Sequence, residues 1–258
     1  MTAASHGPLN ASARLAQRLG RKVDRLGFDT PSHVYNPLRY AWPAHRQYLQ
    51  RFGASRGRVL LLGMNPGPWG MAQTGVPFGE VGMVRDWLGI VAPLRPPLPP
   101  QHPRYPIRGF ACMRSEGSGH RFWGWARRRF ASPEEFFARF MVWNYCPLLF
   151  LADNRNLIPG KLRAAEAAPL LAACDAALES LIRALAPSAV VGIGRYAEAR
   201  ARVVAGERLK VGFLPHPSPA NPAANRDWSA LAEAALAPWL ACVAATPAIY
   251  PAERARGS

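Results

Sequence analysis

Four short apolar runs alternate with stretches of helical periodicity, and this alternation constrains the fold of the 258-residue chain most strongly. The runs are expected to be strands, at residues 58–62, 140–143, 189–193 and 209–214. Strands that alternate with helices form parallel sheets with helices on both faces. The sequence therefore predicts an α/β fold, a single-domain three-layer α/β/α sandwich around a four-stranded, mainly parallel sheet.

The helices around these strands are predicted from local patterns. Leu15, Leu19, Val23 and Leu26 recur at helical spacing among arginines, which predicts a basic amphipathic helix. Further helices are expected at residues 36–52, 79–89, 166–186 and 225–241, after Ser132 with Pro133 at the first position, and from Arg195 onward. The proline-dense residues 91–108 are expected to be a loop. One domain is predicted at residues 11–245, with flexible tails at 1–10 and 246–258.

The charge of the chain points to a polyanionic partner. Lys and Arg number 32 and Asp and Glu number 16, which gives a formal net charge of +16. An excess this large favours nucleic acid as the partner. The alternative is that the chain is Arg-rich through genome composition, which its many Ala and Pro residues also suggest.

The cysteines argue against a metal centre and for a reducing compartment. They are far apart and form no CxxC pair, so neither zinc nor an iron–sulfur cluster is expected: Cys112, Cys146, Cys174 and Cys242. No apolar run is long enough to span a bilayer, and the N-terminus has no signal-peptide core. We expect an intracellular monomer without membrane association, cytoplasmic and nucleoid-associated if bacterial, as the composition suggests, and nuclear if eukaryotic.

Three of the predicted strands end in a lone polar side chain: Asn65, Asn144 and His216. The carboxyl ends of parallel strands gather at one edge of the sheet, so the three side chains could line one pocket. Two asparagines and a histidine form a poor metal site and lack a nucleophile, but an Asn amide can pair with the N–H and C=O edge of a planar ligand. Phe78 could stack on such a ligand.

Each of these residues also has a structural explanation. An isolated Asn in a loop is often a turn former, so Asn65 need not be catalytic. His216 lies between prolines and could be a structural hydrogen bonder, and Asn144 could cap its strand end. Phe78 could belong to the core.

Residues 63–89, 144–151 and 216–225 resemble the single-strand-selective monofunctional uracil-DNA glycosylase family, SMUG-type, of the uracil-DNA glycosylase superfamily. The run GMNPGPWGMAQTGVPFGEVGMVRDWLGI carries most of the likeness, which extends loosely from about residue 35 to residue 240. Other classes of the superfamily differ at this turn, where they carry GQDPYH or GINPG, or have clustered cysteines. The resemblance implies the uracil-DNA glycosylase fold.

The resemblance also implies roles for the residues of the pocket. Asn65 would position water at the sugar C1′, and His216 would stabilise charge at uracil O2. Asn144 would read the base edge and Phe78 would stack on the ring. Three further residues are expected to border the base: Met64 through its backbone, and Gly67 and Met71 at C5, where a bound water excludes a thymine methyl but gives way to a hydroxymethyl group.

Residues 216–225 resemble the DNA-intercalating loop of the family. The expected DNA contacts are Pro217, Ser218, Pro219, Ala220, Asn221 and Arg226. Ala220 stands where members of the family place an arginine that fills the vacated base stack, and Arg226 lies close enough in sequence to compensate. The run 127–129 is either a set of phosphate contacts or a solvated helix face.

The function expected from the resemblance is that of a monofunctional DNA glycosylase. It would flip uracil, and 5-hydroxymethyluracil, out of single- or double-stranded DNA, hydrolyse the N-glycosidic bond and leave an abasic site for base-excision repair. No metal or cofactor is expected. The alternatives are a mismatch-selective thymine or xanthine DNA glycosylase of the same superfamily and a non-catalytic DNA-binding protein.

Overall fold

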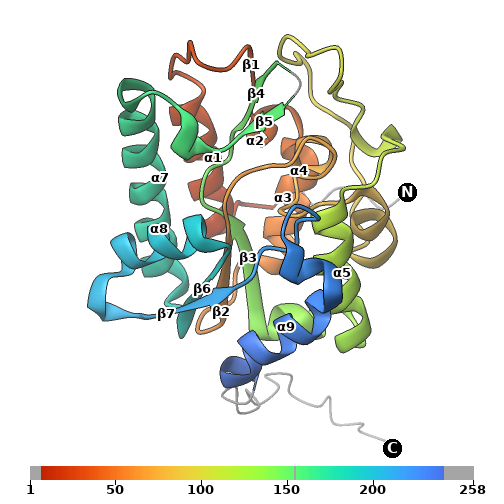
Figure 1. Cartoon of the computed structure of the whole chain (residues 1–258), viewed down its shortest axis with the longest axis vertical. Helices are drawn as coiled ribbons and strands as arrows, with labels where there is room; N and C mark the ends of the chain where they lie inside the picture. Colours follow the sequence, from red (N-terminus) through yellow and green to blue (C-terminus); the bar gives the residue numbers. More distant parts are fainter. Residues whose placement is uncertain (1–6, 154, 241–258) are drawn as a thin grey trace, which may run out of the picture.

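A four-stranded parallel sheet forms the centre of the molecule (Figure 1). The structure is a computed structural model, which describes residues 7–153 and 155–240. The strand order is β3-β2-β6-β7, and every neighbouring pair is parallel. The strands are β2 (Val59–Gly63), β3 (Phe140–Asn144), β6 (Ala189–Ile193) and β7 (Lys210–Leu214). The predicted α/β fold with a four-stranded parallel sheet is confirmed, and each strand lies within one residue of its predicted position.

Helices pack on both faces of the sheet. A β-carbon on Gly192 of β6 would overlap the backbone of Glu198 in α8 (Arg195–Ala205), and one on Gly212 of β7 would overlap Trp239 of α9 (Pro222–Leu240). Gly192 pairs with Phe213, the residue after Gly212, so the two glycines face opposite sides of the sheet. Helices α8 and α9 therefore lie in different layers.

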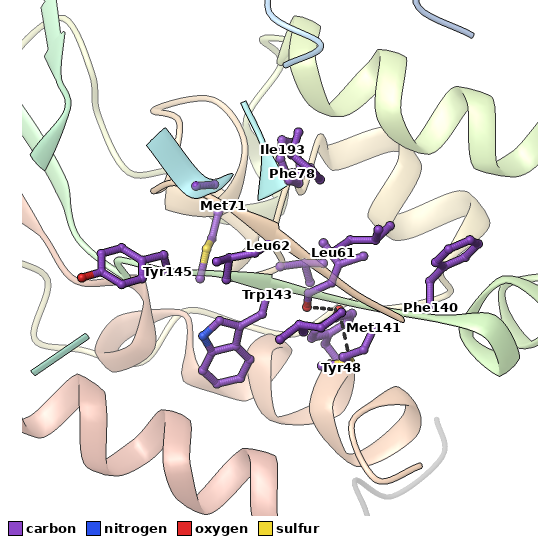
Figure 2. Packing of buried hydrophobic residues seen from close by; sticks show 14 of the residues in the cluster. Tyr48, Leu61, Leu62, Met71, Phe78, Phe140, Met141, Trp143, Tyr145 and Ile193 are labelled. Atoms are coloured by element: carbon purple, nitrogen blue, oxygen red, sulfur yellow. Dashed lines mark hydrogen bonds between the residues drawn. The ribbon is translucent and has the colours of Figure 1, made fainter. Parts of the chain in front are cut away.

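The other helices divide between these two layers. Helix α7 (Ala164–Leu185) packs on α8, and α1 (Ala11–Val23) on α7, whereas α5 (Gly117–Arg129) packs on α9. Figure 1 shows α7 and α8 on one side of the sheet and α5 and α9 on the other. In Figure 2, Tyr48 of α3 (Trp42–Phe52) lies with Met141 and Trp143 below β3, and Phe78 and Ile193 lie above it.

Several short elements were not predicted. A second sheet is antiparallel, with the order β1-β4-β5: β1 (His33–Tyr35), β4 (Leu149–Ala152) and β5 (Arg155–Leu157). The helix predicted at residues 36–52 is divided at Ala41 into α2 (Pro37–Tyr40) and α3. The helix predicted after Ser132 is α6 (Pro133–Arg139), and the helix predicted at residues 79–89 contains the π-helix η1 (Met83–Trp87). Further elements without a prediction are α4 (Met71–Thr74) and the 3-10 turns η2 (Gly109–Ala111), η3 (Pro159–Lys161) and η4 (Gly206–Arg208). Segments of three or four residues are too short to show a hydrophobic period.

Residues 7–10, which we expected in a flexible tail, are bonded to α3. Asn10 caps α1 through Ala13 N–H and donates its amide to the carbonyl of Leu49, and Gln50 binds the carbonyl of Pro8. Residues 1–6 and the whole predicted tail 246–258 lie outside the described residues. Across residues 7–153 and 155–240, no helix is long and apolar enough to cross a membrane.

Candidate active site

The carboxyl ends of the parallel strands open into one cavity of about 510 Å³, which is in the size range of small-molecule sites. Asn65 follows β2, Asn144 ends β3 and His216 follows β7, and all three line the cavity. The strand register explains this arrangement, because Gly63 pairs with Asn144 and Ile193 with Leu214, so the strands end level with one another.

Asn144 is held in the cavity wall by its neighbours. Its side chain is buried and donates an amide hydrogen to the sulfur of Met71 at 3.2 Å. A β-carbon on the paired residue Gly63 would overlap Oδ1 of Asn144 and would lie 2.9 Å from Cε2 of Phe78. Glycine at position 63 therefore creates the space in which the Asn144 amide and the Phe78 ring come together.

Phe78 has a strained backbone. Its φ is +53°, a left-handed conformation that costs an aromatic residue of order 1–3 kcal/mol. Two hydrogen bonds fix the turn. The backbone N–H of Glu80 donates to the carbonyl of Phe78 at 2.8 Å, and the indole N–H of Trp123 donates to the carbonyl of Pro77 at 3.2 Å. The ring is stacked on Phe122, with centroids 4.9 Å apart, and lies 5.9 Å from the ring of His216. The strain thus positions an aromatic face beside the cavity.

His216 is a neutral imidazole with a defined proton position. Its Nδ1 accepts the backbone N–H of Ser218 at 3.1 Å. Burial lowers the pKa of His216 to about 4, so the ring is uncharged at neutral pH. Because Nδ1 is the acceptor, the single ring proton lies on Nε2, which makes Nε2–H a hydrogen-bond donor at the cavity.

Asn65 lies in a turn that is fixed against residues 145–148, the connection between β3 and β4. The carbonyls of Gly63 and Met64 accept the N–H groups of Tyr145 and Cys146, both at 2.9 Å. The Asn65 amide donates to the carbonyl of Leu148 at 3.3 Å. The backbone of Met64 is thus part of the scaffold that presents Asn65.

Gln73 connects the cavity wall around Gly67 and Met71 to a distant loop. Its buried amide donates to the carbonyls of Pro68 and Pro106 at 2.8 and 3.1 Å. Its carbonyl accepts the N–H groups of Arg108 and Gly109 at 2.8 and 3.1 Å. All four hydrogen-bonding positions of this side chain are used, which fixes the backbone that lines the cavity.

The predicted DNA-contacting loop forms the rim of the cavity, with Ser218, Pro219, Ala220 and Asn221 in its lining. Pro219 and Ala220 are exposed, whereas Pro217 is buried and contributes its carbonyl, which accepts from Arg121 at 3.2 Å. Arg226 lies outside the cavity, in an adjoining concavity on α9 with Arg121 and Arg128. The structure therefore does not bring Arg226 to the place that Ala220 occupies.

Sequence reasoning missed five residues of the lining: Pro68, Glu116, Gly117, Ser118 and Asn156. Glu116 places a carboxyl in the cavity wall, where the residues predicted from the sequence are all uncharged or a histidine. It caps α5 by accepting Gly119 N–H at 2.7 Å, and burial raises its pKa. The available signal was the run Glu-Gly-Ser-Gly, an acid before small residues at a helix start, but nothing in it indicates which cavity the helix faces.

The other cavities and side-chain clusters of the described residues give weaker evidence of a functional site. Within residues 7–153 and 155–240, no three His, Cys, Asp or Glu side chains lie close enough to hold a metal ion. A second cavity of about 410 Å³ lies between α1, α2 and residues 95–99 and contains none of the predicted site residues. Trp123 and Trp125 are buried packing residues, and residues 127–129 are exposed on α5.

Comparison with known proteins identifies the family. Residues 50–237 match the family model of the uracil DNA glycosylase superfamily. The single-strand selective monofunctional uracil DNA glycosylase of Bos taurus is 50% identical over 221 residues, covering 84% of this chain and 81% of that protein. The protein of the same name from Mus musculus is 50% identical over 220 residues, covering 83% and 78%.

A solved structure supports the same fold at low sequence identity. The crystal structure of wild-type Pedobacter heparinus SMUG2 superposes with a TM-score of 0.64 and 15% identity, covering 89% of this chain and 97% of that one. The chain therefore belongs to the uracil DNA glycosylase superfamily and, within it, to the family of single-strand selective monofunctional uracil DNA glycosylases.

Proposed function

We propose that this protein is a monofunctional uracil-DNA glycosylase, which hydrolyses the N-glycosidic bond of uracil in DNA and leaves an abasic site for base-excision repair. The observation that carries the proposal is the convergence of Asn65, Asn144 and a neutral His216 on one cavity beside the ring of Phe78. A base inside a duplex cannot reach such a cavity, so the nucleotide is flipped out of the stack.

The cavity wall matches the edge of uracil. The Asn144 amide offers an N–H donor for O4 and an oxygen acceptor for N3–H, whereas cytosine presents the opposite pattern. Because Asn144 is buried, a mismatched base would leave its polar atoms unpaired. The Phe78 ring supplies an apolar face for the base plane. Asn144 is thus the specificity residue for uracil against cytosine.

The reaction needs stabilisation of opposite charges on sugar and base. As the C1′–N1 bond breaks, positive charge develops on the sugar and negative charge on the base. The Nε2–H of His216 donates to uracil O2, where the negative charge collects, and such a donor contributes about 10²–10³ in rate. Asn65 positions the water that adds at C1′, and its neutral amide does not act as a strong base.

The lysines support a hydrolytic reaction without a Schiff base. Lys22 lies in α1, Lys161 in η3 and Lys210 at the amino end of β7. None of the three contributes to the cavity lining. Water is therefore the nucleophile in this proposal, and the strand is not cut by the enzyme itself.

The rim of the cavity indicates the strand preference of the enzyme. The exposed tip Pro219–Ala220 is small and cannot fill the gap that a flipped base leaves in a duplex. We therefore expect faster cleavage of uracil in single strands than in U·A pairs, with the weaker U·G pair between them. 5-Hydroxymethyluracil is a further proposed substrate. The active species is proposed to be a monomer, and size-exclusion chromatography with light scattering would test this oligomeric state.

The test is a strand-cleavage assay on labelled oligonucleotides with one uracil, in single-stranded, U·A and U·G form. Wild type is compared with Asn65→Ala, His216→Leu and the surface control Arg183→Ala. Cleavage only after hot alkali, with losses of about 10²-fold or more in the first two variants, supports the proposal. Cleavage before alkali would contradict the monofunctional mechanism.

Two other outcomes correspond to the alternatives. Faster removal of thymine from G·T, or of xanthine, than of uracil would identify a mismatch-type glycosylase of the same superfamily. DNA binding without cleavage of any base, indifferent to Asn65→Ala and His216→Leu, would identify a non-catalytic DNA-binding protein.

A further inference from the structure

A row of cationic and aromatic side chains lies beside the cavity and has no part in the proposed reaction. The guanidinium carbon of Arg114 lies 4.9 Å from the ring centroid of Trp69, and that of Arg104 lies 5.9 Å from the ring centroid of Tyr105. The two rings are 5.5 Å apart and inclined at 47°. These four residues, in the order Arg104, Tyr105, Trp69 and Arg114, form what we call the arginine–aromatic row.

One end of the row adjoins the cavity wall. Trp69 follows Pro68, and Arg114 comes two residues before Glu116, and both Pro68 and Glu116 line the cavity. A β-carbon on Gly67 would lie 3.4 Å from Oε1 of Glu116, so the two chain segments meet at the wall. The contact between Trp69 and Arg114 therefore lies close to the mouth of the cavity.

The exposed tip Pro219–Ala220 stands on the other side of residues 116–117. A β-carbon on Gly117 would lie 3.0 Å from Cγ of Pro219. A DNA strand whose uracil occupies the cavity must leave the mouth in two directions. The tip meets the strand in one direction, and the arginine–aromatic row lies in the other.

The arginines of the row differ from those in the other arginine–ring contacts of the described residues. Across residues 7–153 and 155–240, no carboxylate forms an ion pair with Arg104 or Arg114, and both residues are exposed. Their hydrogen-bond donors are therefore accessible to an anionic partner. In the other four contacts the arginine pairs with a carboxylate: Arg51 with Glu134, Arg129 with Glu233, Arg195 with Glu198 and Arg200 with Asp175.

The chemistry of the row fits single-stranded DNA. A planar guanidinium that lies over an aromatic ring has a second face on which a base can stack. Stacking of this kind, together with phosphate contacts, binds single strands whatever their sequence. Met113, next to Arg114, is 93% exposed and presents apolar surface that a sugar or base would cover. A base within a duplex is already stacked on its neighbours and gains less from such a surface.

We propose that the arginine–aromatic row binds single-stranded DNA beside the flipped nucleotide, with the neighbouring base stacked on the guanidinium of Arg114. The proposal rests on the proposed function, because the uracil in the cavity sets where its neighbour lies. Trp69 supports the other face of the guanidinium, and Arg104, at the far end of the row, pairs with a phosphate. The row thus favours single strands over duplexes.

Two variants of Arg114 separate stacking from charge. Arg114→Lys keeps the cation but has no planar group, whereas Arg114→Ala removes both. Affinities are measured by fluorescence anisotropy on labelled single strands that carry 2′-fluorodeoxyuridine, whose glycosidic bond resists hydrolysis. The nucleotide on the 5′ side, or on the 3′ side, either keeps its base or is replaced by a tetrahydrofuran residue that has none.

Removal of the neighbouring base on one side should weaken binding to wild type by about fivefold or more, the scale of one stacked base. In both Arg114 variants the same removal should change the affinity by less than about twofold. Arg114→Lys should keep the wild-type slope of log affinity against log salt, and Arg114→Ala should reduce it by about 1. On a U·A duplex, Arg114→Lys should bind as tightly as wild type.

Arg51→Ala is the matched control. The guanidinium of Arg51 lies 4.7 Å from the ring centroid of Phe52, and its loss changes the net charge by the same amount as Arg114→Ala. Phe52 lies at the amino edge of the sheet, where its carbonyl accepts from Arg58, the residue before β2, at 2.8 Å. This variant should keep the wild-type dependence on the neighbouring base.

The outcomes distinguish this proposal from the proposed function. If removal of the neighbouring base has the same effect in wild type and both Arg114 variants, or no effect in wild type, the role of the row is overturned, whether or not uracil is cleaved. If wild type binds none of the single strands, the row is overturned as well. Absence of uracil cleavage in the strand-cleavage assay overturns the glycosylase function, while the binding measurements still decide the role of Arg114.

Discussion

The backbone N–H of Ser218 donates a hydrogen bond of 3.1 Å to Nδ1 of His216. The contact lies within the loop that also forms the rim of the cavity, where the Asn221 amide binds the carbonyl of His216 at 3.0 Å. One short loop therefore sets both the tautomer of the histidine and the shape of the DNA-contacting tip. Movement of this tip on DNA would be transmitted directly to the imidazole.

Neutral His216 predicts a flat pH profile. Because burial lowers its pKa to about 4, the ring does not change charge between pH 6 and 8, and the single-turnover rate on uracil should be constant in that range. Nitrogen NMR of the imidazole should show Nε2 protonated throughout. An inflection near pH 6.5 that disappears in His216→Leu would contradict this assignment.

Gly63→Ala should abolish most activity while the fold persists. The added methyl group would overlap Oδ1 of Asn144 and approach Cε2 of Phe78 to 2.9 Å, so both groups must move. A displacement of this size costs about 10² in rate when it misplaces a substrate-binding group. Rates and thermal unfolding are compared with Gly27→Ala, which has open space around its β-carbon. A variant of full activity would show that Asn144 does not need this position.

Gln73→Leu should destabilise the protein and weaken the reaction. Four hydrogen bonds are lost from a buried side chain, and each buried polar partner left unpaired costs about 1–3 kcal/mol. Because water can hydrogen-bond to some of the backbone groups that lose Gln73, we expect the free energy of unfolding, measured with urea, to fall by about 3 kcal/mol. A loss below 1 kcal/mol would mean that the wall around Pro68 is held by other contacts.

Acid should destabilise the fold through His45. Its Nδ1 donates to the carbonyl of Gly75 at 2.6 Å, its buried Nε2 has no partner, and burial lowers its pKa to about 4. The unfolded chain binds a proton near pH 6.5 and the folded chain only near pH 4, so stability is complete above pH 6.5 and falls as the pH drops toward 4. The loss at pH 5 is about 2 kcal/mol.

The pH dependence of His45 is tested by urea unfolding at pH 8 and pH 5. His45→Gln has no titrating ring, so the difference between the two pH values should shrink by about 2 kcal/mol relative to wild type. The remaining slope includes His216, whose pKa is lowered in the same direction. An unchanged difference would show that His45 is protonated in the folded protein.

Arg226→Ala should weaken DNA binding without affecting chemistry. The side chain is exposed on α9 in the concavity beside the DNA-contacting loop. Loss of one phosphate contact reduces the slope of log affinity against log salt by about 1. Arg183→Ala is the control, since Arg183 lies in the last turn of α7, at the opposite edge of the sheet. If the slope of log affinity against log salt is the same in wild type and Arg226→Ala, DNA does not contact Arg226.

The sheet was predictable because β2, β3 and β6 are buried along their whole length and read as continuous apolar runs. The short strands β1, β4 and β5 and the break at Ala41 were not predictable, since their pairing depends on contacts far apart in the sequence. The Tyr35 hydroxyl, for example, donates to the carbonyl of Tyr105 at 2.9 Å across 70 residues. No local pattern encodes such a contact.

The residues of the candidate site likewise divide into those that the sequence predicts and those that it does not. Asn65, Asn144 and His216 could be selected from the sequence because each directly follows a recognisable strand, and the parallel topology then requires that the strand ends meet. Glu116 and Ser118 follow a long irregular segment, whose path in space no periodicity fixes. Arg226 is close to Ala220 in sequence, but α9 turns it into a separate concavity.

The sequence by itself determined the four strands of the parallel sheet, the polar strand ends and the family, because these depend on local hydrophobic pattern and on a contiguous motif. Only the tertiary structure decided the charge state of His216, the strained backbone of Phe78 and the place of Glu116 in the wall. These properties arise from burial and from hydrogen bonds between distant segments, which exist only once the chain has packed.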